Sequence, residues 1–449
     1  MTDALTRLGD AVEFFVQSNA RVSISGVVTE VSPSHFRVEG LSKFLRLDDC
    51  VLLQGADRAC HGQAIRIDRR GVLVKSFESN AGVGLGARVT LLGPIRIAPH
   101  PGWKGRVVDA LGHPIDGRGP LPQGAPLSLD AAPPNPMLRA RVHTPAPTGV
   151  AAIDAFTPLC RGQRVGVFAG SGVGKSTLLS MMTRSAAFDT AVICLVGERG
   201  REVRDFLTEA LGMSAANAVV VVATGDESPM MRRLAPLTAT TIAESFRDAG
   251  QSVLLIMDSV TRYAHALREI ALAAGEPPAA NGFAPSVFAD IPRLLERAGP
   301  GLDAGGAITA IFSVLVDGDN HNDPIADCVR GTLDGHIVLE REIAEQGRYP
   351  AINILKSISR LSDRVWSAEQ RDIVARARAL VSRFEDTRDL RLLGGYQPGG
   401  DALLDRAVAL TPVIYQALQQ TPDAPAKNGA IAELAAILAH RPAPVTGKL

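Results

Sequence analysis

Hydrophobic and polar positions follow a first pattern over residues 20–92. Short runs rich in Val, Ile and Leu, such as VSISGVV and GVLVKSF, are separated there by Gly, Ser and Asp. Strands this short and this regularly spaced predict a small β-barrel. The stretch GVGLGA at 82–87 is also rich in glycine, but its spacing does not fit GxGxxG and no helical pattern follows. We interpret it as a barrel turn.

A second pattern covers residues 150–359, where near-continuous apolar runs alternate with helical stretches. The apolar runs are RVGVFAG, AVICLVG, AVVVVAT, SVLLIMD, AITAIFSVLV and HIVLER. Strands that are apolar on both faces indicate a parallel sheet covered by helices on both sides. A Pro- and Gly-rich connection at 93–149 should join the barrel to this α/β domain. Residues 360–449 show helical periodicity without strand signals, which predicts a C-terminal helical bundle.

The N-terminal segment, residues 1–19, has Leu5, Leu8, Val12 and Phe15 at helical spacing. This spacing predicts a short amphipathic helix ahead of the barrel. Two interpretations stay open: a helix packed on its own domain, or an arm that binds a partner protein.

Composition narrows the class of protein. The 449 residues are 46% hydrophobic and 21% charged, which suits several domains with sizeable cores. Basic and acidic residues number 47 each, and a net charge of zero argues against a sequence-independent nucleic-acid binder. The five cysteines form no CxxC pair, and no signal peptide or membrane-length apolar run is present. We therefore expect a cytoplasmic protein with reduced thiols.

A phosphate-binding loop is predicted where RVGVFAG meets SGVGKSTLLSMM. Glycines let backbone N–H groups wrap a phosphate chain, and the helix that follows adds positive potential. Lys175 should reach the β- and γ-phosphates of ATP, and Ser176 should offer its hydroxyl to Mg²⁺. The usual pattern begins with Gly where this chain has Ala169. A chance Gly-rich turn is the alternative, which the preceding strand and following helix disfavour. The predicted binding set is Gly170, Ser171, Gly172, Val173, Gly174, Lys175, Ser176 and Thr177.

Two strand ends supply candidate carboxylates. SVLLIMD ends in Asp258, and ligands of open α/β sheets bind at the carboxyl ends of strands, so we expect Asp258 to hold Mg²⁺ through water. A helix-capping Asp is the alternative. AVICLVG is followed by Glu198, which can polarise the attacking water. From spacing alone Glu202 and Asp205 compete for that role, and a surface salt bridge is an equal alternative.

These motifs together resemble the rotary ATPase family. The matching segments are AGSGVGKS, GERGRE, LLIMDSVTRYAHALREI, PSVFADIPRLLERAG and the signature-like PAINILKSIS. Within that family the chain most resembles the ATPases of type III protein export, the flagellar export ATPase in particular, on RGTLDGHIVLERE and GRYPAINILKSISR. The resemblance covers almost the whole chain. It implies an N-terminal β-barrel, a RecA-like P-loop core and a C-terminal helical bundle.

The resemblance also implies roles for individual residues. Glu198 matches the catalytic carboxylate, and Arg199 matches a γ-phosphate contact. Tyr349 matches the aromatic that stacks on adenine, and Tyr396 is a second candidate for that pocket, although Tyr349 can equally be a core tyrosine. Arg360, which closes SISR, matches an arginine finger supplied to the neighbouring subunit, and this implies a six-membered homo-oligomeric ring. A surface arginine is the alternative.

The implied function is hydrolysis of MgATP to energise type III export. The enzyme would release export substrates from chaperones and deliver them to a membrane export gate at the inner membrane. The family also implies a stator-like negative regulator at the N-terminal segment and a central stalk-like protein. Alternatives are a virulence-type (injectisome) ATPase, an ATP synthase catalytic subunit and a ring-shaped RNA translocase. The last needs base-stacking aromatics, and only 4% of residues are aromatic.

A polar loop at residues 317–323 resembles a calcium-binding loop without fitting it. The sixth position is Asn322 where Gly is needed, and the twelfth is Cys328 where Glu is needed. We predict a polar loop near the subunit interface and no structural metal held by the protein.

Overall fold

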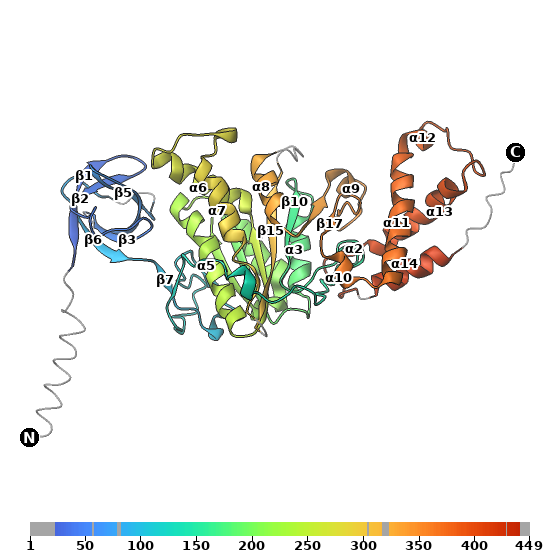
Figure 1. Ribbon diagram of the computed structural model, residues 1–449, viewed down its shortest axis with the longest axis horizontal. Helices are drawn as coiled ribbons and strands as arrows, with labels where there is room; N and C mark the ends of the chain where they lie inside the picture. Colours follow the sequence, from blue (N-terminus) through green and yellow to red (C-terminus); the bar gives the residue numbers. More distant parts are fainter. Residues whose placement is uncertain are drawn as a thin grey trace, which may run out of the picture. The chain divides into compact units, whose positions relative to one another are not determined.

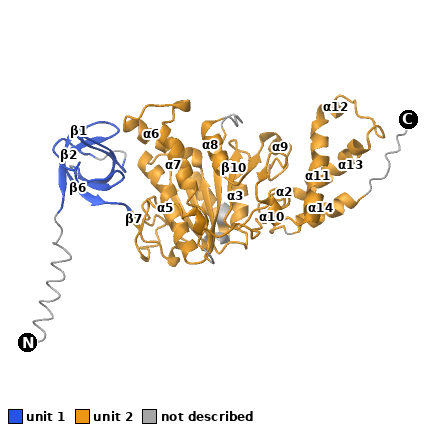
Figure 2. Ribbon diagram, in the orientation of Figure 1, with its two compact units in different colours: residues 1–95 blue, residues 96–449 orange. Residues whose placement is uncertain are grey.

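The structure is a computed structural model that describes residues 23–55, 58–78, 82–302, 305–316, 323–427 and 429–440. The predictions for residues 1–19, and for the polar loop up to residue 322, lie outside these ranges. The chain divides into two compact units, Met1–Ile95 and Arg96–Leu449 (Figure 2). None of the helices formed by the described residues is long and apolar enough to cross a membrane.

The first unit contains a closed barrel of antiparallel strands in the order β1-β2-β5-β4-β3-β6. Its strands are β1 (Ser25–Val31), β2 (Phe36–Glu39), β3 (Cys50–Gln54), β4 (Ala59–Asp68), β5 (Gly71–Ser76) and β6 (Arg88–Gly93). Inward-facing residues such as Val38, Val51 and Val89 are fully buried and fill the interior. Residues 82–87 form a turn before β6. Closure pairs every strand edge, which suits a domain of short strands.

The connection at 93–149 is more ordered than its prolines predicted. The two-residue strands β7 (Arg96–Ile97) and β9 (Leu127–Ser128) pair with each other, and β8 (Val107–Val108) joins the sheet of the α/β domain beside β12. Trp103 is buried, and its indole N–H donates to the carbonyl of Pro122 at 2.7 Å. Strands of two residues show no periodicity, which explains why the sequence pattern did not reveal them.

The second unit is built on a sheet in the order β17-β16-β10-β15-β13-β11-β12-β8, with β14 paired to β15. Figure 1 labels β10, β15 and β17 of this sheet. The pairs from β16 to β8 are parallel, whereas β17 and β14 pair antiparallel. Its strands are β10 (Arg164–Ala169), β11 (Thr190–Val196), β12 (Ala218–Ala223), β13 (Ser252–Asp258), β14 (Gly299–Pro300), β15 (Ala307–Leu315), β16 (Gly335–Leu339) and β17 (Ile358–Ser359). Every residue of β11, β12 and β13 is buried, as the apolar runs predicted.

Helices follow most of these strands, as expected for parallel crossovers. They are α2 (Ala151–Phe156), α3 (Lys175–Thr183), α4 (Gly200–Asp205), α5 (Pro229–Asp248), α6 (Val260–Ala273), α7 (Pro285–Leu295), α8 (Pro324–Thr332) and α9 (Arg341–Glu345). Asp323, the last residue of the predicted polar loop, caps α8: its carboxylate accepts the backbone N–H groups of Ile325 and Ala326. This arrangement brings the carboxyl ends of β10, β11 and β13 to one edge of the sheet.

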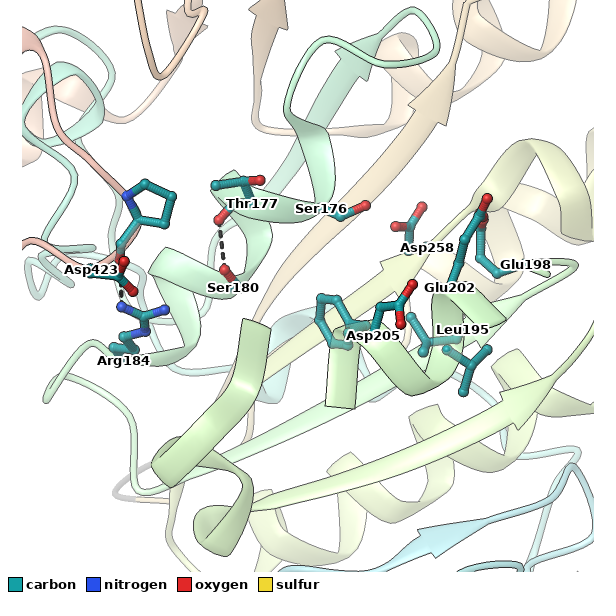
Figure 3. Close-up of a pocket in the computed structure, with 13 residues that line it drawn as sticks. Ser176, Thr177, Ser180, Arg184, Leu195, Glu198, Glu202, Asp205, Asp258 and Asp423 are labelled. Carbon is teal, nitrogen blue, oxygen red and sulfur yellow. Dashed lines mark hydrogen bonds between the residues drawn. The ribbon is translucent and has the colours of Figure 1, made fainter. Parts of the chain in front are cut away.

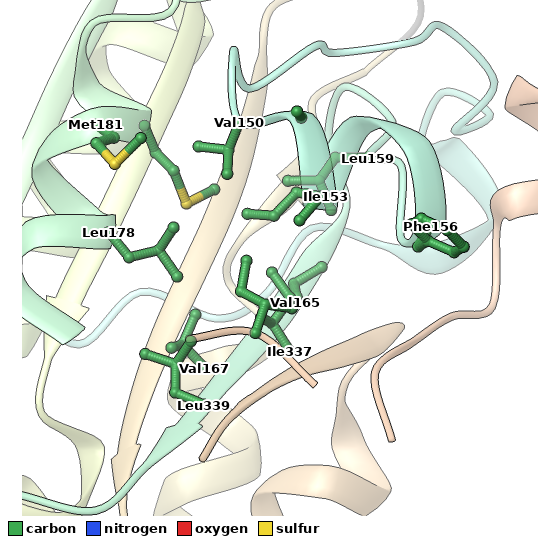
Figure 4. Packing of buried hydrophobic residues seen from close by; sticks show 14 of the residues in the cluster. Val150, Ile153, Phe156, Leu159, Val165, Val167, Leu178, Met181, Ile337 and Leu339 are labelled. Carbon is green, nitrogen blue, oxygen red and sulfur yellow. The ribbon is translucent and has the colours of Figure 1, made fainter. Parts of the chain in front are cut away.

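The C-terminal part is helical, as predicted. It comprises α10 (Ser362–Val365), α11 (Ala368–Asp386), α12 (Arg388–Leu392), α13 (Ala402–Leu418) and α14 (Ala430–Ala439). A capping box of Ser367 and Gln370 begins α11. Buried residues of α11, α13 and α14 belong to the same hydrophobic cluster as those of α2, α3 and β10. Figure 4 shows part of this cluster, where Ile153 and Leu178 lie near Val165, Val167 and Ile337. The predicted fold class is therefore confirmed.

Candidate active site

The loop between β10 and α3 has the backbone of an anion site. Gly172 and Gly174 adopt φ values of 78° and 89°, in the left-handed region that favours glycine. Val173 between them is buried in the hydrophobic cluster and anchors the loop. Gly174 is the N-cap of α3, so the unpaired N–H groups of the first helical turn begin at Lys175. A phosphate chain fits such a loop and helix start.

Asp258 lies at the end of β13 beside this loop. The Lys175 ammonium donates to Oδ1 of Asp258 at 2.5 Å, and the Ser313 hydroxyl donates to the same oxygen at 3.0 Å. The side chain of Asp258 is only 4% exposed, so these two donors compensate much of the cost of burying its charge. Ser313, on the neighbouring strand β15, was not predicted.

The donor atoms at this point suit Mg²⁺. The ion prefers oxygen ligands, and in nucleotide sites it takes one or two protein oxygens together with phosphate oxygens. The Ser176 hydroxyl and the Asp258 carboxylate line one cavity next to the phosphate-type loop, and both are hard oxygen donors. These residues therefore fit the predicted metal.

Glu198 follows β11, and its backbone is fixed by the neighbouring strand end. Its carbonyl accepts the N–H of Gly225 at 3.0 Å, and Gly197 donates to Ala223 at 2.7 Å. The pKa of Glu198 is raised to about 7, chiefly by burial and then by the negative charge of Asp258 and a hydrogen bond with Glu202. Lys175 and Arg262 act in the opposite direction. A carboxyl group that titrates near neutral pH can accept a proton from water under physiological conditions.

Arg262, in the first turn of α6, is a second residue near the site, besides Ser313, that was not predicted. A Cβ built on Gly197 would lie 3.0 Å from the Cβ of Arg262, so the arginine packs directly against the glycine before Glu198. Gly197 has a φ of 70°, which also favours glycine here. The sequence carried one signal for Arg262: it stands four residues after Asp258, at the start of a helix that follows a strand end.

A cavity of about 430 Å³ is lined by Ser176, Glu198 and Asp258 together (Figure 3). Polar side chains from α3, the end of β11, α4 and the end of β13 surround it. Its lining comprises Ser176, Thr177, Ser180, Arg184, Leu195, Glu198, Glu202, Val203, Asp205, Phe206, Asp258, Pro422 and Asp423. Glu202 and Asp205, which competed with Glu198 on spacing alone, therefore lie at the same site. Pro422 and Asp423 come from the C-terminal helical part, and the Arg184 guanidinium donates to the carbonyl of Pro422 at 2.5 Å.

Of the predicted loop residues, Ser176 and Thr177 line this cavity and Gly170 to Lys175 do not. Four predicted residues outside the loop do not line it either. Tyr349 is 46% exposed, and its ring lies beside the phosphate-type loop, since a Cβ built on Gly174 would be 3.6 Å from two ring atoms. The Arg199 side chain is 74% exposed and pairs with Glu202 at 3.3 Å. Tyr396 donates its hydroxyl to Asp405 at 2.7 Å, in the segment between α12 and α13.

Arg360 is the fourth of these residues. It directly follows β17, its side chain is exposed, and its backbone N–H donates to the carbonyl of Asp334 at 2.9 Å. The cavity of its own chain does not include it. Its predicted role in a neighbouring subunit needs an exposed guanidinium, and the exposure of this side chain is compatible with that role.

Comparison with known proteins gives matches over nearly the whole chain. Residues 149–359 match the family of the ATP synthase alpha/beta nucleotide-binding domain, and residues 366–435 match the C-terminal domain of the type III secretion ATPase EscN. A flagellum-specific ATP synthase of Agrobacterium fabrum is 53% identical over 97% of this chain and 92% of its own length. A type 3 secretion system ATPase of Xanthomonas euvesicatoria is 43% identical over 89% of this chain and 90% of its own length.

Solved structures agree with these matches. The assembled ATPase EscN of the enteropathogenic E. coli type III secretion system superposes with a TM-score of 0.86 at 39% identity, covering 92% of this chain and 100% of EscN. EscN in complex with its central stalk EscO superposes with a TM-score of 0.84 at 38% identity, with the same coverage.

Proposed function

This chain belongs to the ATP synthase alpha/beta family, among its flagellar and type III secretion ATPases, and from this premise we propose that it hydrolyses MgATP to drive export of flagellar components. It is an ATPase with a nucleotide substrate. The observation that carries the proposal is that Ser176, at the helix start after the phosphate-type loop, lines one cavity with a buried Asp258 and with Glu198, whose pKa is raised.

Each of the site residues has a separate role in hydrolysis. The glycine loop and the start of α3 bind the phosphates, and Lys175 moves from Asp258 toward the β- and γ-phosphates when nucleotide binds. Ser176, and Asp258 through water, would hold Mg²⁺, which would neutralise charge on the phosphate oxygens. Ser313 keeps Asp258 oriented while Lys175 leaves it. Tyr349 stacks on the adenine, and Tyr396 is proposed as a further contact of the base.

Glu198 positions the attacking water and takes its proton. Its carboxylate form is required for this step, and the positive charges of Lys175 and Arg262 favour that form. Arg199 contacts the γ-phosphate. Because substitution of a carboxylate by an amide preserves size but removes basicity, Glu198→Gln separates binding from hydrolysis.

The site is completed by a neighbouring subunit. Arg360 is exposed and does not line its own chain's cavity, so we assign it to the next subunit, where its guanidinium stabilises charge on the transferring phosphoryl group. This role requires a homo-oligomer, and we propose a six-membered ring. The assembled state of EscN supports an oligomer, and the complex of EscN with EscO supports a central stalk-like partner for this chain.

The remaining partners follow from the export role. We propose that a stator-like negative regulator binds residues 1–19 in the cytoplasm. We also propose that ATP turnover releases substrates from export chaperones and passes them to a membrane export gate at the inner membrane. No nucleic-acid partner is proposed.

Injectisome export is the second candidate function. Identity favours the flagellar role, since the Agrobacterium fabrum relative is 53% identical and the Xanthomonas euvesicatoria secretion ATPase is 43% identical.

Complementation tests the choice between them. The native chain and Glu198→Gln are expressed in a flagellate bacterium that lacks its flagellum-specific ATPase, and in a bacterium that lacks its injectisome ATPase. We expect filament export only from the first strain and only with the native chain. Export restored only in the injectisome strain would support injectisome export as the function instead. If Glu198→Gln supports as much export as the native chain, export does not require ATP hydrolysis by Glu198.

A further inference from the structure

The segment that presents Arg360 is tied to the start of β10 by a buried glutamine. Gln163 directly precedes β10 and is completely buried. Its Nε2 donates to the Ser359 hydroxyl at 3.1 Å and to the carbonyl of Asp334 at 3.3 Å. Its Oε1 accepts the N–H of Cys160 at 2.9 Å. The nitrogen and the oxygen of this buried amide are therefore both hydrogen-bonded.

Hydrogen bonds also hold the residue before Arg360 and the Arg360 backbone N–H. Ser359 is the last residue of β17, and its hydroxyl donates to the carbonyl of Pro158 at 2.8 Å. The Arg360 N–H donates to the same Asp334 carbonyl that Gln163 contacts. The Asp334 carboxylate in turn accepts the backbone N–H and Nε of Arg164, at 3.0 and 3.2 Å. The exposed Arg360 side chain thus extends from a backbone that is held by buried and half-buried hydrogen bonds.

These hydrogen bonds should keep the backbone at Arg360 rigid. Hydrogen bonds in a dry interior are strong, and a fully bonded buried network holds its members in one geometry. A long arginine that acts across an interface needs that rigidity, since a misplacement of about 1 Å of a catalytic group can lower the rate about 10²-fold. Loss of either the amide or the hydroxyl would leave buried polar groups unpaired and free this segment to shift.

We propose that Gln163 and Ser359 are positioning residues that aim Arg360 at the neighbouring subunit's nucleotide. The proposal rests on the proposed role of Arg360 in trans. It assigns two tasks to one strand: β10 ends in the loop that binds this chain's own phosphates, and its start fixes the arginine offered to the next chain.

Mixed rings test this directly. Subunits with Arg360→Ala keep an intact phosphate site but lack the arginine. Subunits with Lys175→Ala cannot turn over their own nucleotide but still present Arg360, so mixing the two should restore ATPase activity. The Lys175→Ala subunit is therefore the donor of Arg360. Two test donors combine Lys175→Ala with Gln163→Ala or with Ser359→Ala. A matched control donor combines it with Thr411→Val, which removes a buried hydroxyl of α13 that donates to Leu380 at 3.4 Å.

We expect the Lys175→Ala and control donors to restore activity, and the two test donors to give a kcat about 10²-fold lower at unchanged KM. Ring assembly, followed by sedimentation of the same mixtures, should be equal for all donors. Equal restoration by every donor would overturn the proposal, as would loss of assembly confined to the test donors. Failure of the Lys175→Ala donor itself would instead refute the trans role of Arg360 and so the proposed ring mechanism.

Discussion

At the residue scale, Glu198 combines burial with proximity to charges of both signs. Burial, Asp258 and Glu202 raise its pKa, whereas Lys175 and Arg262 lower it, and the balance lies at about 7. The protonated carboxyl cannot accept a proton from water, so activity should depend on pH in a range where an ordinary glutamate is fully ionised.

The first prediction concerns this pH dependence. Because only the carboxylate is active, kcat/KM should rise as pH increases through about 7 and level off above it. Glu202→Ala removes a hydrogen bond that raises the pKa, so it should move the midpoint to lower pH. Steady-state kinetics of the native chain and this variant measure both effects. A flat native profile between about pH 6 and 8 would contradict the assigned base.

The second prediction concerns Ser313. Partners that orient a metal ligand typically contribute 10- to 100-fold to metal affinity, so Ser313→Ala should raise the Mg²⁺ concentration for half-maximal activity by about that factor. Titration of Mg²⁺ at saturating ATP measures it. Ser245→Ala, which removes a hydroxyl bonded within α5 to Ile242, is the control and should leave the titration unchanged. If the Mg²⁺ concentration for half-maximal activity is unchanged in Ser313→Ala, Ser313 does not orient Asp258 for metal binding.

Sequence could identify only the residues that lie in local motifs. Lys175 lies in a recognisable glycine-rich motif and Asp258 at a recognisable strand end, and the structure brings them together. Ser313 is one polar residue in an apolar run, and its partner Asp258 is 55 residues away. Asp423 reaches the cavity only because the C-terminal helices pack on the α/β domain. No local sequence pattern predicts such long-range contacts.

At the scale of elements, a buried ion pair joins α5 to the segment after α7. Arg297 is 2% exposed and bonds Glu244 through two nitrogens, at 3.0 and 2.6 Å. It also donates to Thr241 at 2.9 Å and to the carbonyl of Leu129 at 2.7 Å. Removing one partner would leave a buried charge without compensation.

The third prediction follows from this pair. Glu244→Ala should lower the free energy of unfolding by about 3–5 kcal/mol, measured by urea denaturation. Asp372→Ala, which breaks the exposed pair with Arg376 on α11, should cost no more than about 1 kcal/mol. Equal effects of the two substitutions would show that burial does not govern the energetics of these pairs.

Elements were predictable where their periodicity was long enough. The strands from β10 to β16 that lie in apolar runs, and the helices α11, α13 and α14, were expected from the sequence. The two-residue strand β8 was not, because it exists only through pairing with β12. Its neighbours in the Pro-rich connection are held by contacts such as Trp103 to Pro122, which no periodicity encodes.

At the scale of the whole molecule, the sequence predicted a barrel, an α/β domain and a helical bundle, and this fold class is observed. It did not predict how closely the last two are joined. The Gln420 side chain accepts the N–H of Ala151 at 2.7 Å and donates to the carbonyl of Gly149 at 3.0 Å, and one hydrophobic cluster runs through both parts. The C-terminal helices are therefore in direct contact with the domain that carries the phosphate-type loop.

The fourth prediction tests the central claim, that each site is completed by a neighbouring chain. We would measure ATPase specific activity as a function of protein concentration for the native chain and for Arg360→Ala, with nucleotide binding measured in parallel. The specific activity of the native chain should rise steeply as rings form. Arg360→Ala should bind nucleotide normally with a kcat lower by about 10³–10⁵, at every concentration. Clear turnover that is independent of concentration in both proteins would contradict the account, because each chain would then carry a complete site.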